Sequence, residues 1–277
     1  MPELPEVEVV RQGLVPLVTG RTILAIATSR KKLRKPFPRA KMHEFAKGAT
    51  ILAVTRRAKY LLLHLSSKAL LVFHLGMTGK LGLFPPEGPA KKHDHLRFLL
   101  DNGKEMRFHD VRRFGFAELF TAEELARHEP FAELGPEPFA AEFSAEYLFE
   151  KAGRKRMPIK GYLMDNRVVV GLGNIYANET LFAAGIHPET PANMVQKREW
   201  QRIVTASRAI LTKAIAMGGS TISDYENASG KPGYFQLELA VYGRDGKPCP
   251  RCRQAIRRLV LGGRATFFCP RCQRLRG

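Results

Sequence analysis

Four cysteines near the C-terminus constrain the fold of this chain more than any other feature. They form two Cys-x-x-Cys pairs separated by 16 residues: Cys249 with Cys252, and Cys269 with Cys272. This spacing is typical of one structural Zn²⁺ held by four thiolates. Disulfide bonds are the alternative, but they fit poorly with a cytosolic chain. We therefore expect a zinc site built on a C-terminal hairpin.

Two glycines between the cysteine pairs predict the turn of that hairpin. Gly262 and Gly263 are adjacent, and Arg264 follows them directly. Zinc would fix a strand pair whose tip carries this arginine, a residue suited to gripping a phosphate.

The charge of the chain indicates a polyanionic partner. Its 277 residues include 45 Lys and Arg against 26 Asp and Glu, which gives a net charge of +19. Nucleic acid is favoured over a membrane surface because no basic amphipathic anchor is evident. A cationic surface that only confers solubility is the weaker alternative. The chain shows neither an apolar run long enough to span a bilayer nor an apolar signal segment, so we expect a cytoplasmic protein.

Residue patterns divide the chain into three predicted domains: 1–132, 133–236 and 237–277. Up to about residue 120 the sequence reads as short strands, with an Asn102-Gly103 hairpin signal, and this favours a β-sandwich or barrel. Helical periodicity follows a Pro- and Gly-rich stretch at 133–138. The longest predicted helix, 199–217, has Ser207 as the one polar break in its apolar face.

The N-terminus carries candidate catalytic groups. Without Met1, Pro2 becomes a secondary amine with a pKa of about 7.7–8.0, able to attack a sugar carbon and form an iminium. Glu3 could serve as the acid or base for that step. Pro5 predicts the start of a helix, and the positive N-terminal end of this helix would lower the pKa of the amine. Pro16 should end or kink the helix near residue 15. An ordinary capped helix is the alternative explanation.

Several loops carry candidate nucleic-acid contacts. The segment Gly171–Tyr176 superficially resembles a dinucleotide-binding motif, but Tyr176 occupies the third glycine position. It is better explained as a tight turn between helices, which is either a phosphate clamp or a plain helix corner. Two glycine-containing loops could project Met77, Arg112 and Phe114 to fill the gap left by an extruded base, although such apolar residues are more often core. The basic stretch Arg154–Arg156, with Lys160, could bind phosphates.

These motifs together closely resemble those of bacterial formamidopyrimidine-DNA glycosylase, from Pro2 to Gln273. The matching segments are 2–7, 56–62, 92–95, 165–177, 230–235 and 264–270, and the four cysteines complete the match. The resemblance implies an α+β multidomain fold: an N-terminal β-sandwich with flanking helices, a helix–two-turn–helix domain, and a C-terminal zinc-finger hairpin with DNA in a cleft. It implies a monomeric bacterial enzyme that excises 8-oxoguanine and formamidopyrimidines from double-stranded DNA and then nicks the strand.

The resemblance also implies roles for individual residues. Pro2 would be the nucleophile and Glu3 the acid/base, Lys59 would assist base release and β-elimination, and Arg264 would grip phosphate and take part in δ-elimination. The implied DNA contacts are His93, Arg112, Lys155, Lys160 and Asn174, with Met77 and Phe114 filling the void beside Arg112. The loop 221–234 corresponds to the lesion-recognition loop.

Two positions depart from the family pattern, and two other functions remain open. Val9 replaces the usual threonine, and Arg253 replaces the glycine that usually follows the second zinc cysteine. An endonuclease VIII-type enzyme for oxidised pyrimidines would share the machinery, but Leu4 stands where that branch usually has glycine. A non-catalytic binder of damaged DNA is the other alternative, and intact Pro2, Glu3 and Lys59 argue against it.

Overall fold

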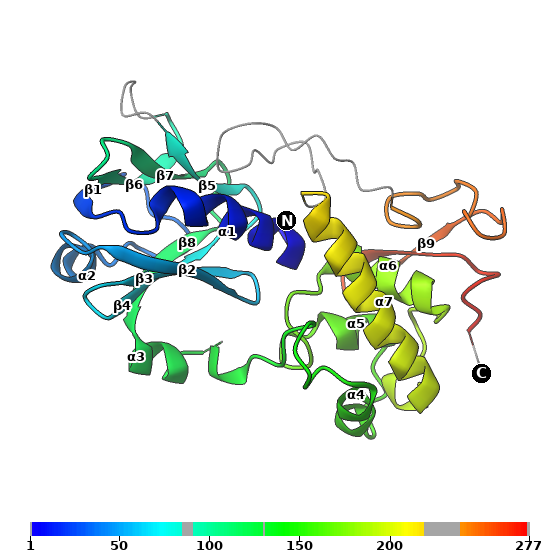
Figure 1. The fold of residues 1–277 in the computed structure, drawn as a ribbon. Helices are drawn as coiled ribbons and strands as arrows, with labels where there is room; N and C mark the ends of the chain where they lie inside the picture. Colours follow the sequence, from blue (N-terminus) through cyan, green and yellow to red (C-terminus); the bar gives the residue numbers. More distant parts are fainter. Residues whose placement is uncertain (1, 85–90, 130, 219–238, 276–277) are drawn as a thin grey trace. The chain divides into compact units, whose positions relative to one another are not determined.

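The computed structural model describes residues 2–84, 91–129, 131–218 and 239–275, and its secondary structure is drawn in Figure 1. It separates into two compact units. The first covers Met1–Ala132 together with Met217–Gln236, of which residues 217 and 218 are described. The second covers Glu133–Ala216 and Leu237–Gly277. The predicted lesion-recognition loop, 221–234, lies outside the described residues.

The first unit is a sandwich of two antiparallel sheets of four strands each, with strand orders β1-β6-β7-β5 and β2-β3-β4-β8. Its elements are α1 (Leu4–Val18), β1 (Ile23–Thr28), α2 (Arg39–Phe45), β2 (Ile51–Arg57), β3 (Tyr60–Leu65), β4 (Ala69–His74), β5 (Gly79–Phe84), β6 (Asp94–Leu100), β7 (Glu105–Asp110), β8 (Phe116–Thr121) and α3 (Ala122–Arg127). Alternating apolar residues of both sheets, among them Phe73, Phe98 and Phe108, face a shared core.

Helix α1 lies along this sandwich and contacts an edge strand of each sheet, β2 and β5. Val7, Val10, Leu14 and Val18 on its buried face are at most 1% exposed, so packing fixes the position of the helix. Of the two effects predicted for Pro16, an end or a kink, the end near residue 15 was wrong, because α1 continues through Pro16 to Val18. A proline this close to the C-terminus removes few hydrogen bonds, and Thr19 N still donates to Val15 O.

The second unit surrounds a central helix, α6. Its elements are the short 3₁₀ turn η1 (Phe131–Glu133), which begins before the unit boundary, α4 (Ala145–Ala152), α5 (Ile159–Met164), α6 (Asn174–Ala184), η2 (Ala192–Met194), α7 (Lys197–Ala216), β9 (Arg257–Leu261) and β10 (Arg264–Phe268). Helix α6 is buried on nearly every side and packs against α5, α7 and β10. Ser207 of α7 is fully buried, as its place in the apolar stripe predicted.

Candidate active site and nucleic-acid interface

The start of α1 holds the two residues predicted to act first. Pro2 is half-buried directly before the helix cap. Glu3 is the N-cap residue and only 2% exposed, and its backbone N–H donates to Glu6 Oε2 at 2.8 Å. Glu3 and Glu6 thereby form a capping box, with a carboxylate in place of the usual hydroxyl. The backbone beside Pro2 is therefore held in one conformation, whereas most chain ends fray.

Lys59 lies in the two-residue turn between β2 and β3, where Arg57 pairs with Tyr60. His74 stands opposite Tyr60 at the end of β4. Burial, followed by the positive charges of Lys59 and Arg34, lowers the pKa of His74 to about 4. Its Nδ1 accepts the N–H of Gly76 at 3.1 Å, so in the neutral ring Nε2 carries the hydrogen.

Sequence reasoning missed His74 as a possible functional residue. A histidine at the end of an apolar strand, directly before a Leu-Gly turn, was the available signal. Its proximity to Lys59 depends on the pairing of β3 with β4, a long-range contact that no local pattern reveals. The neutral ring is a hydrogen-bond donor beside an ammonium group, and this pair of donors suits a phosphate oxygen.

The loops that carry Met77, Arg112 and Phe114 are joined to each other. Met77 is 38% and Phe114 is 45% exposed, and the Arg112 guanidinium lies 4.8 Å from the centroid of the Phe114 ring. Thr78 Oγ1 donates to Asp110 Oδ1 at 2.6 Å and accepts the backbone N–H of Arg112 at 3.0 Å. Thr78 therefore joins the two loops, and an arginine lies over an aromatic ring at their surface.

Glycine is required where these loops meet. A Cβ on Gly76 would lie 2.4 Å from the backbone nitrogen of Gly115, and one on Gly115 would lie 2.7 Å from His74 O. Asp110 Oδ2 also accepts the Gly115 N–H at 2.8 Å. The glycines thus allow a backbone approach that any side chain would prevent.

His93 lies just before β6 and is half-buried. Its ring centroid is 5.7 Å from that of His109 and 6.1 Å from that of His95. His109 Nδ1 lies 2.9 Å from Asp94 Oδ1, and Arg107 forms an ion pair with the same carboxylate. This cluster holds the segment that begins at His93 against the first sheet.

In the second unit, the glycine turn before α6 has the predicted form. Gly171 takes a left-handed backbone with φ +85°, and Gly173 is the N-cap of α6. Asn174 is half-buried, and its Nδ2 donates to Ala265 O on β10 at 3.0 Å. The side chain therefore connects the start of α6 to the zinc hairpin.

Lys160 was predicted to contact DNA, and its burial argues against that role. It is 1% exposed, and its Nζ donates to Ala265 O at 3.0 Å and to Thr266 Oγ1 at 2.7 Å. Helix α5 begins at residue 159, and its geometry directs the Lys160 side chain into the protein. The basic composition of the stretch gave no indication of this. Lys155, in contrast, is exposed, with its Nζ 5.6 Å from the Tyr162 ring centroid.

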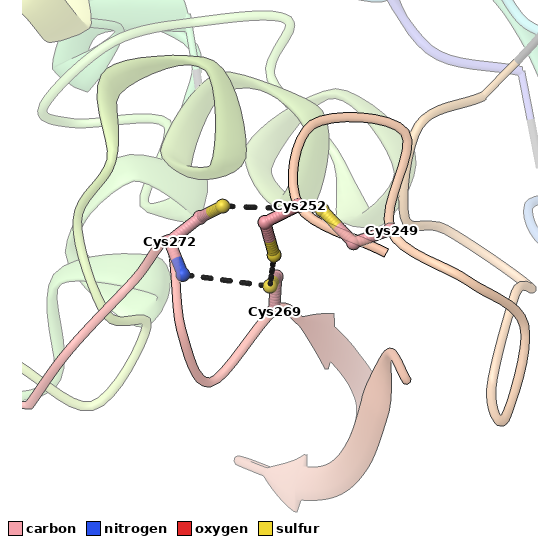
Figure 2. Close-up of side chains that lie close together, drawn as sticks. All are labelled: Cys249, Cys252, Cys269 and Cys272. Atoms are coloured by element: carbon pink, nitrogen blue, oxygen red, sulfur yellow. Dashed lines mark hydrogen bonds between the residues drawn. The ribbon is translucent and has the colours of Figure 1, made fainter. Parts of the chain in front are cut away.

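The four cysteines converge on one point, as Figure 2 shows. Their sulfur atoms all lie within 4.8 Å of one another, with Cys249 and Cys272 3.9 Å apart and Cys252 and Cys269 3.4 Å apart. All four are free thiols. Tetrahedral Zn–S bonds of about 2.3 Å place sulfur atoms roughly 3.8 Å apart, so the cluster fits structural Zn²⁺. Arg264 is exposed at the tip of the attached hairpin.

Three features together define the class of zinc-finger DNA glycosylases. They are a β-sandwich that begins with an ordered proline, a helical unit with a glycine turn, and a zinc hairpin with an arginine at its tip. Family models agree over nearly the whole chain. Residues 1–117 match the formamidopyrimidine-DNA glycosylase N-terminal domain, residues 134–226 its H2TH domain, and residues 246–275 the zinc finger found in FPG and IleRS. The chain belongs to the formamidopyrimidine-DNA glycosylase family.

Individual relatives are similar over their full length. The formamidopyrimidine-DNA glycosylases of Photobacterium profundum and Laribacter hongkongensis are 47% and 48% identical to the chain, covering 99% of it and 100% of each relative. The crystal structure of the MutM (FPG) protein from Thermus thermophilus is 39% identical, with a TM-score of 0.87 and complete coverage of both chains. A Lactococcus lactis FPG mutant bound to Fapy-dG-containing DNA is 35% identical, with a TM-score of 0.89, covering 99% and 100% of the two chains.

Among the described residues, no helix is long and apolar enough to cross a membrane.

Proposed function

We propose that this protein is a bifunctional glycosylase and AP lyase that excises 8-oxoguanine and formamidopyrimidines from duplex DNA. The capped N-terminus carries this proposal, because Pro2 is followed directly by the buried carboxyl group of Glu3. A Lactococcus lactis FPG mutant has been crystallised with Fapy-dG-containing DNA, and Lactococcus lactis Fpg with abasic-site DNA. The first DNA carries a lesion and the second an intermediate of such a reaction.

In the first step the Pro2 nitrogen attacks C1′ of the damaged nucleotide. The bond between C1′ and the base breaks, and its electron pair leaves with the base, which takes up a proton. Glu3 then protonates O4′ as the sugar ring opens, and the nitrogen lone pair forms a C1′ iminium. Burial of Glu3 suits this role, because a carboxyl group shielded from water exchanges its proton with the substrate.

The iminium then makes the strand break possible. It acidifies the C2′ proton, and loss of that proton expels the 3′ phosphate. A second elimination expels the 5′ phosphate, and attack of water on C1′ of the iminium then frees Pro2. We assign Lys59 and the neutral His74 beside it to a DNA phosphate, with Lys59 also assisting proton transfer. Arg264, at the tip of the zinc hairpin, is assigned to a phosphate that leaves.

The remaining assignments concern DNA binding. Met77, Arg112 and Phe114 would occupy the space left by the extruded nucleotide, since they form an exposed apolar and cationic surface on two joined loops. His93, Lys155 and the N-terminal end of α6 at Asn174 would contact phosphates. We propose that the enzyme acts as a cytoplasmic monomer on the bacterial chromosome. We also propose that its three domains comprise residues 1–132, 133–236 and 237–277.

Product analysis on a duplex with a single 8-oxoguanine opposite cytosine tests this function. The wild-type protein is expected to release the base and to leave phosphate on both sides of the gap. The Glu3→Gln variant should bind the duplex but slow opening of the sugar ring, and with it strand cleavage, by about 100-fold or more, since general acid–base catalysis contributes roughly 100- to 10,000-fold. Glu123→Gln, at an exposed acid of α3, is the control. Intact DNA after incubation with the wild-type protein would contradict the proposal.

Oxidised pyrimidines are a second candidate substrate class. Wild-type Lactococcus lactis FPG, 35% identical to this chain, has been crystallised with DNA that contains an oxidised pyrimidine. The same assay with such a duplex separates the two classes, since faster release of the pyrimidine would make it the preferred substrate.

A further inference from the structure

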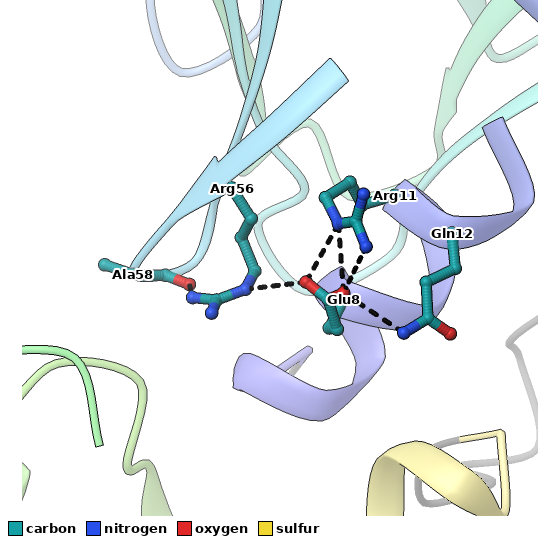
Figure 3. Close-up of polar contacts among 5 residues, drawn as sticks. All are labelled: Glu8, Arg11, Gln12, Arg56 and Ala58. Carbon is teal, nitrogen blue, oxygen red and sulfur yellow. Dashed lines mark hydrogen bonds and ion pairs between the residues drawn. The ribbon is translucent and has the colours of Figure 1, made fainter. Parts of the chain in front are cut away.

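A single arginine connects the helix that begins at the nucleophile to the turn that carries Lys59. Figure 3 shows Arg56, from the end of β2, between Glu8 of α1 and the backbone of Ala58. Its Nε donates to Glu8 Oε2 at 3.1 Å, and its Nη1 donates to Ala58 O at 2.8 Å. The Arg56 side chain is 10% exposed and that of Glu8 is 14%, so water weakens this pair much less than it weakens a surface ion pair.

The turn that receives this hydrogen bond has a strained backbone. Ala58 has φ +54°, in the left-handed region that a residue with a Cβ seldom adopts. It is also only 2% exposed. Such a conformation persists where the surroundings enforce it, and the guanidinium on the Ala58 carbonyl is one of those constraints. Lys59 is the next residue, so the direction of its side chain depends on this peptide.

Glu8 is itself held firmly from the helix side. Arg11 donates to it at 2.6 Å and 2.9 Å, and Gln12 Nε2 donates at 3.1 Å. Burial alone would raise the pKa of Glu8, but Arg11 and Arg56 outweigh it and lower the pKa, so the carboxylate stays ionised. Glu8 lies about one and a half turns of helix after Glu3, on an element whose position the core already fixes.

We propose that Arg56 is a positioning residue for the reaction, acting through the turn that it fastens to α1. Its planar guanidinium joins the carboxylate of Glu8 to the carbonyl of Ala58 and so sets where Lys59 points relative to Pro2 and Glu3. This inference rests on the proposed function. Misplacement of a group by about 1 Å can slow an enzymatic reaction by roughly 100-fold, so loss of the bridge should affect the chemical step.

Single-turnover kinetics with excess enzyme on the 8-oxoguanine duplex test the proposal. Arg56→Gln should slow base release and β-elimination by about 10- to 100-fold. Its affinity for a duplex with a reduced abasic site should change less than about threefold, as a positioning role requires. Arg56→Lys should recover part of the rate, because one ammonium cannot reproduce both contacts. Arg11→Gln is the matched control, since it removes a partner of Glu8 that does not touch the turn.

A second comparison separates positioning from loss of folding. In a Lys59→Met background, Arg56→Gln should slow the reaction no further, because the group that it positions is already absent. Thermal melting confirms that each variant is folded. The proposal is overturned if the folded Arg56→Gln variant reacts at the wild-type rate, or if Arg11→Gln reacts as slowly as Arg56→Gln. It is also overturned if the rate effects of Arg56→Gln and Lys59→Met multiply in the double variant. An inactive wild-type protein would instead contradict the proposed function itself.

Discussion

At the scale of single residues, two lysines of one basic stretch have different environments. Lys155 is exposed, whereas Lys160 is buried against β10 and hydrogen-bonded to Ala265 and Thr266. Composition alone gave both the same predicted role. Burial assigns Lys160 to the support of the zinc hairpin, while Lys155 remains available to a phosphate.

Substitution of each lysine by methionine should separate these roles. Lys160→Met leaves a buried carbonyl with one donor fewer and should lower the free energy of unfolding by about 1–3 kcal/mol. Lys155→Met should leave stability unchanged and reduce the slope of log affinity against log salt by about 1. Chemical denaturation and DNA binding at several salt concentrations measure both. Equal stability of the two variants would contradict the supporting role of Lys160.

His74 predicts a pH dependence of stability. Its folded-state pKa is lowered to about 4, chiefly by burial, so between pH 6.5 and 4 the unfolded chain binds a proton that the folded chain does not. The free energy of unfolding should therefore decrease as the pH is lowered from 6.5 to 4, by on the order of 3 kcal/mol from this residue. The same titration on His74→Gln gives the comparison. An identical pH profile in that variant would show that His74 is not the group responsible.

At the scale of elements, one hydroxyl group makes two of the hydrogen bonds that join the loops after β4 and β7. Thr78→Val keeps the side-chain shape but removes the bond to Asp110 and the acceptor for Arg112. Because extruding an intact base costs more than extruding an abasic site, excision of 8-oxoguanine should slow more than cleavage of a preformed abasic site. Thr55→Val, at an exposed position of β2, is the control. Equal slowing of both reactions would argue against a role in extrusion.

The zinc hairpin should depend on its metal. Cys269→Ser should abolish zinc binding and DNA cleavage together, while the helices around α6 keep their circular dichroism because their core is a separate cluster. Arg253→Gly is the matched variant, since Arg253 has φ +66° and glycine should relieve about 1 kcal/mol of strain there without loss of zinc. Metal analysis with an activity assay tests both variants. A zinc-free, active Cys269→Ser protein would overturn the structural role of the metal.

At the scale of the whole molecule, local signals predicted the elements with strong boundaries. The Asn102-Gly103 turn joins β6 to β7, and the helix predicted at 199–217 is present as α7, Lys197–Ala216. The strands β5 and β8 and the helix α2 were not predicted, because their short sequences carry weak periodicity and depend on pairing or packing partners distant in the chain.

The site residues likewise divide into those that local sequence signals predicted and those that depend on tertiary contacts. Cysteine spacing and the N-terminal motif identified the zinc ligands and the predicted nucleophile, since each depends on residues adjacent in sequence. The neighbourhood of His74, the burial of Lys160 and the link from Arg56 to Glu8 arise from tertiary contacts. Sequence reasoning missed these because no short pattern encodes which strand or helix a side chain will meet.

Pro2 is expected to form a covalent iminium with damaged DNA. Borohydride reduction during turnover on an 8-oxoguanine duplex, followed by peptide mapping, tests it most directly, with undamaged and oxidised-pyrimidine duplexes in parallel. We expect an adduct at Pro2, strongest on 8-oxoguanine and absent from undamaged DNA. An adduct at another residue, or none on any duplex from protein verified to begin at Pro2, would show that Pro2 is not the nucleophile.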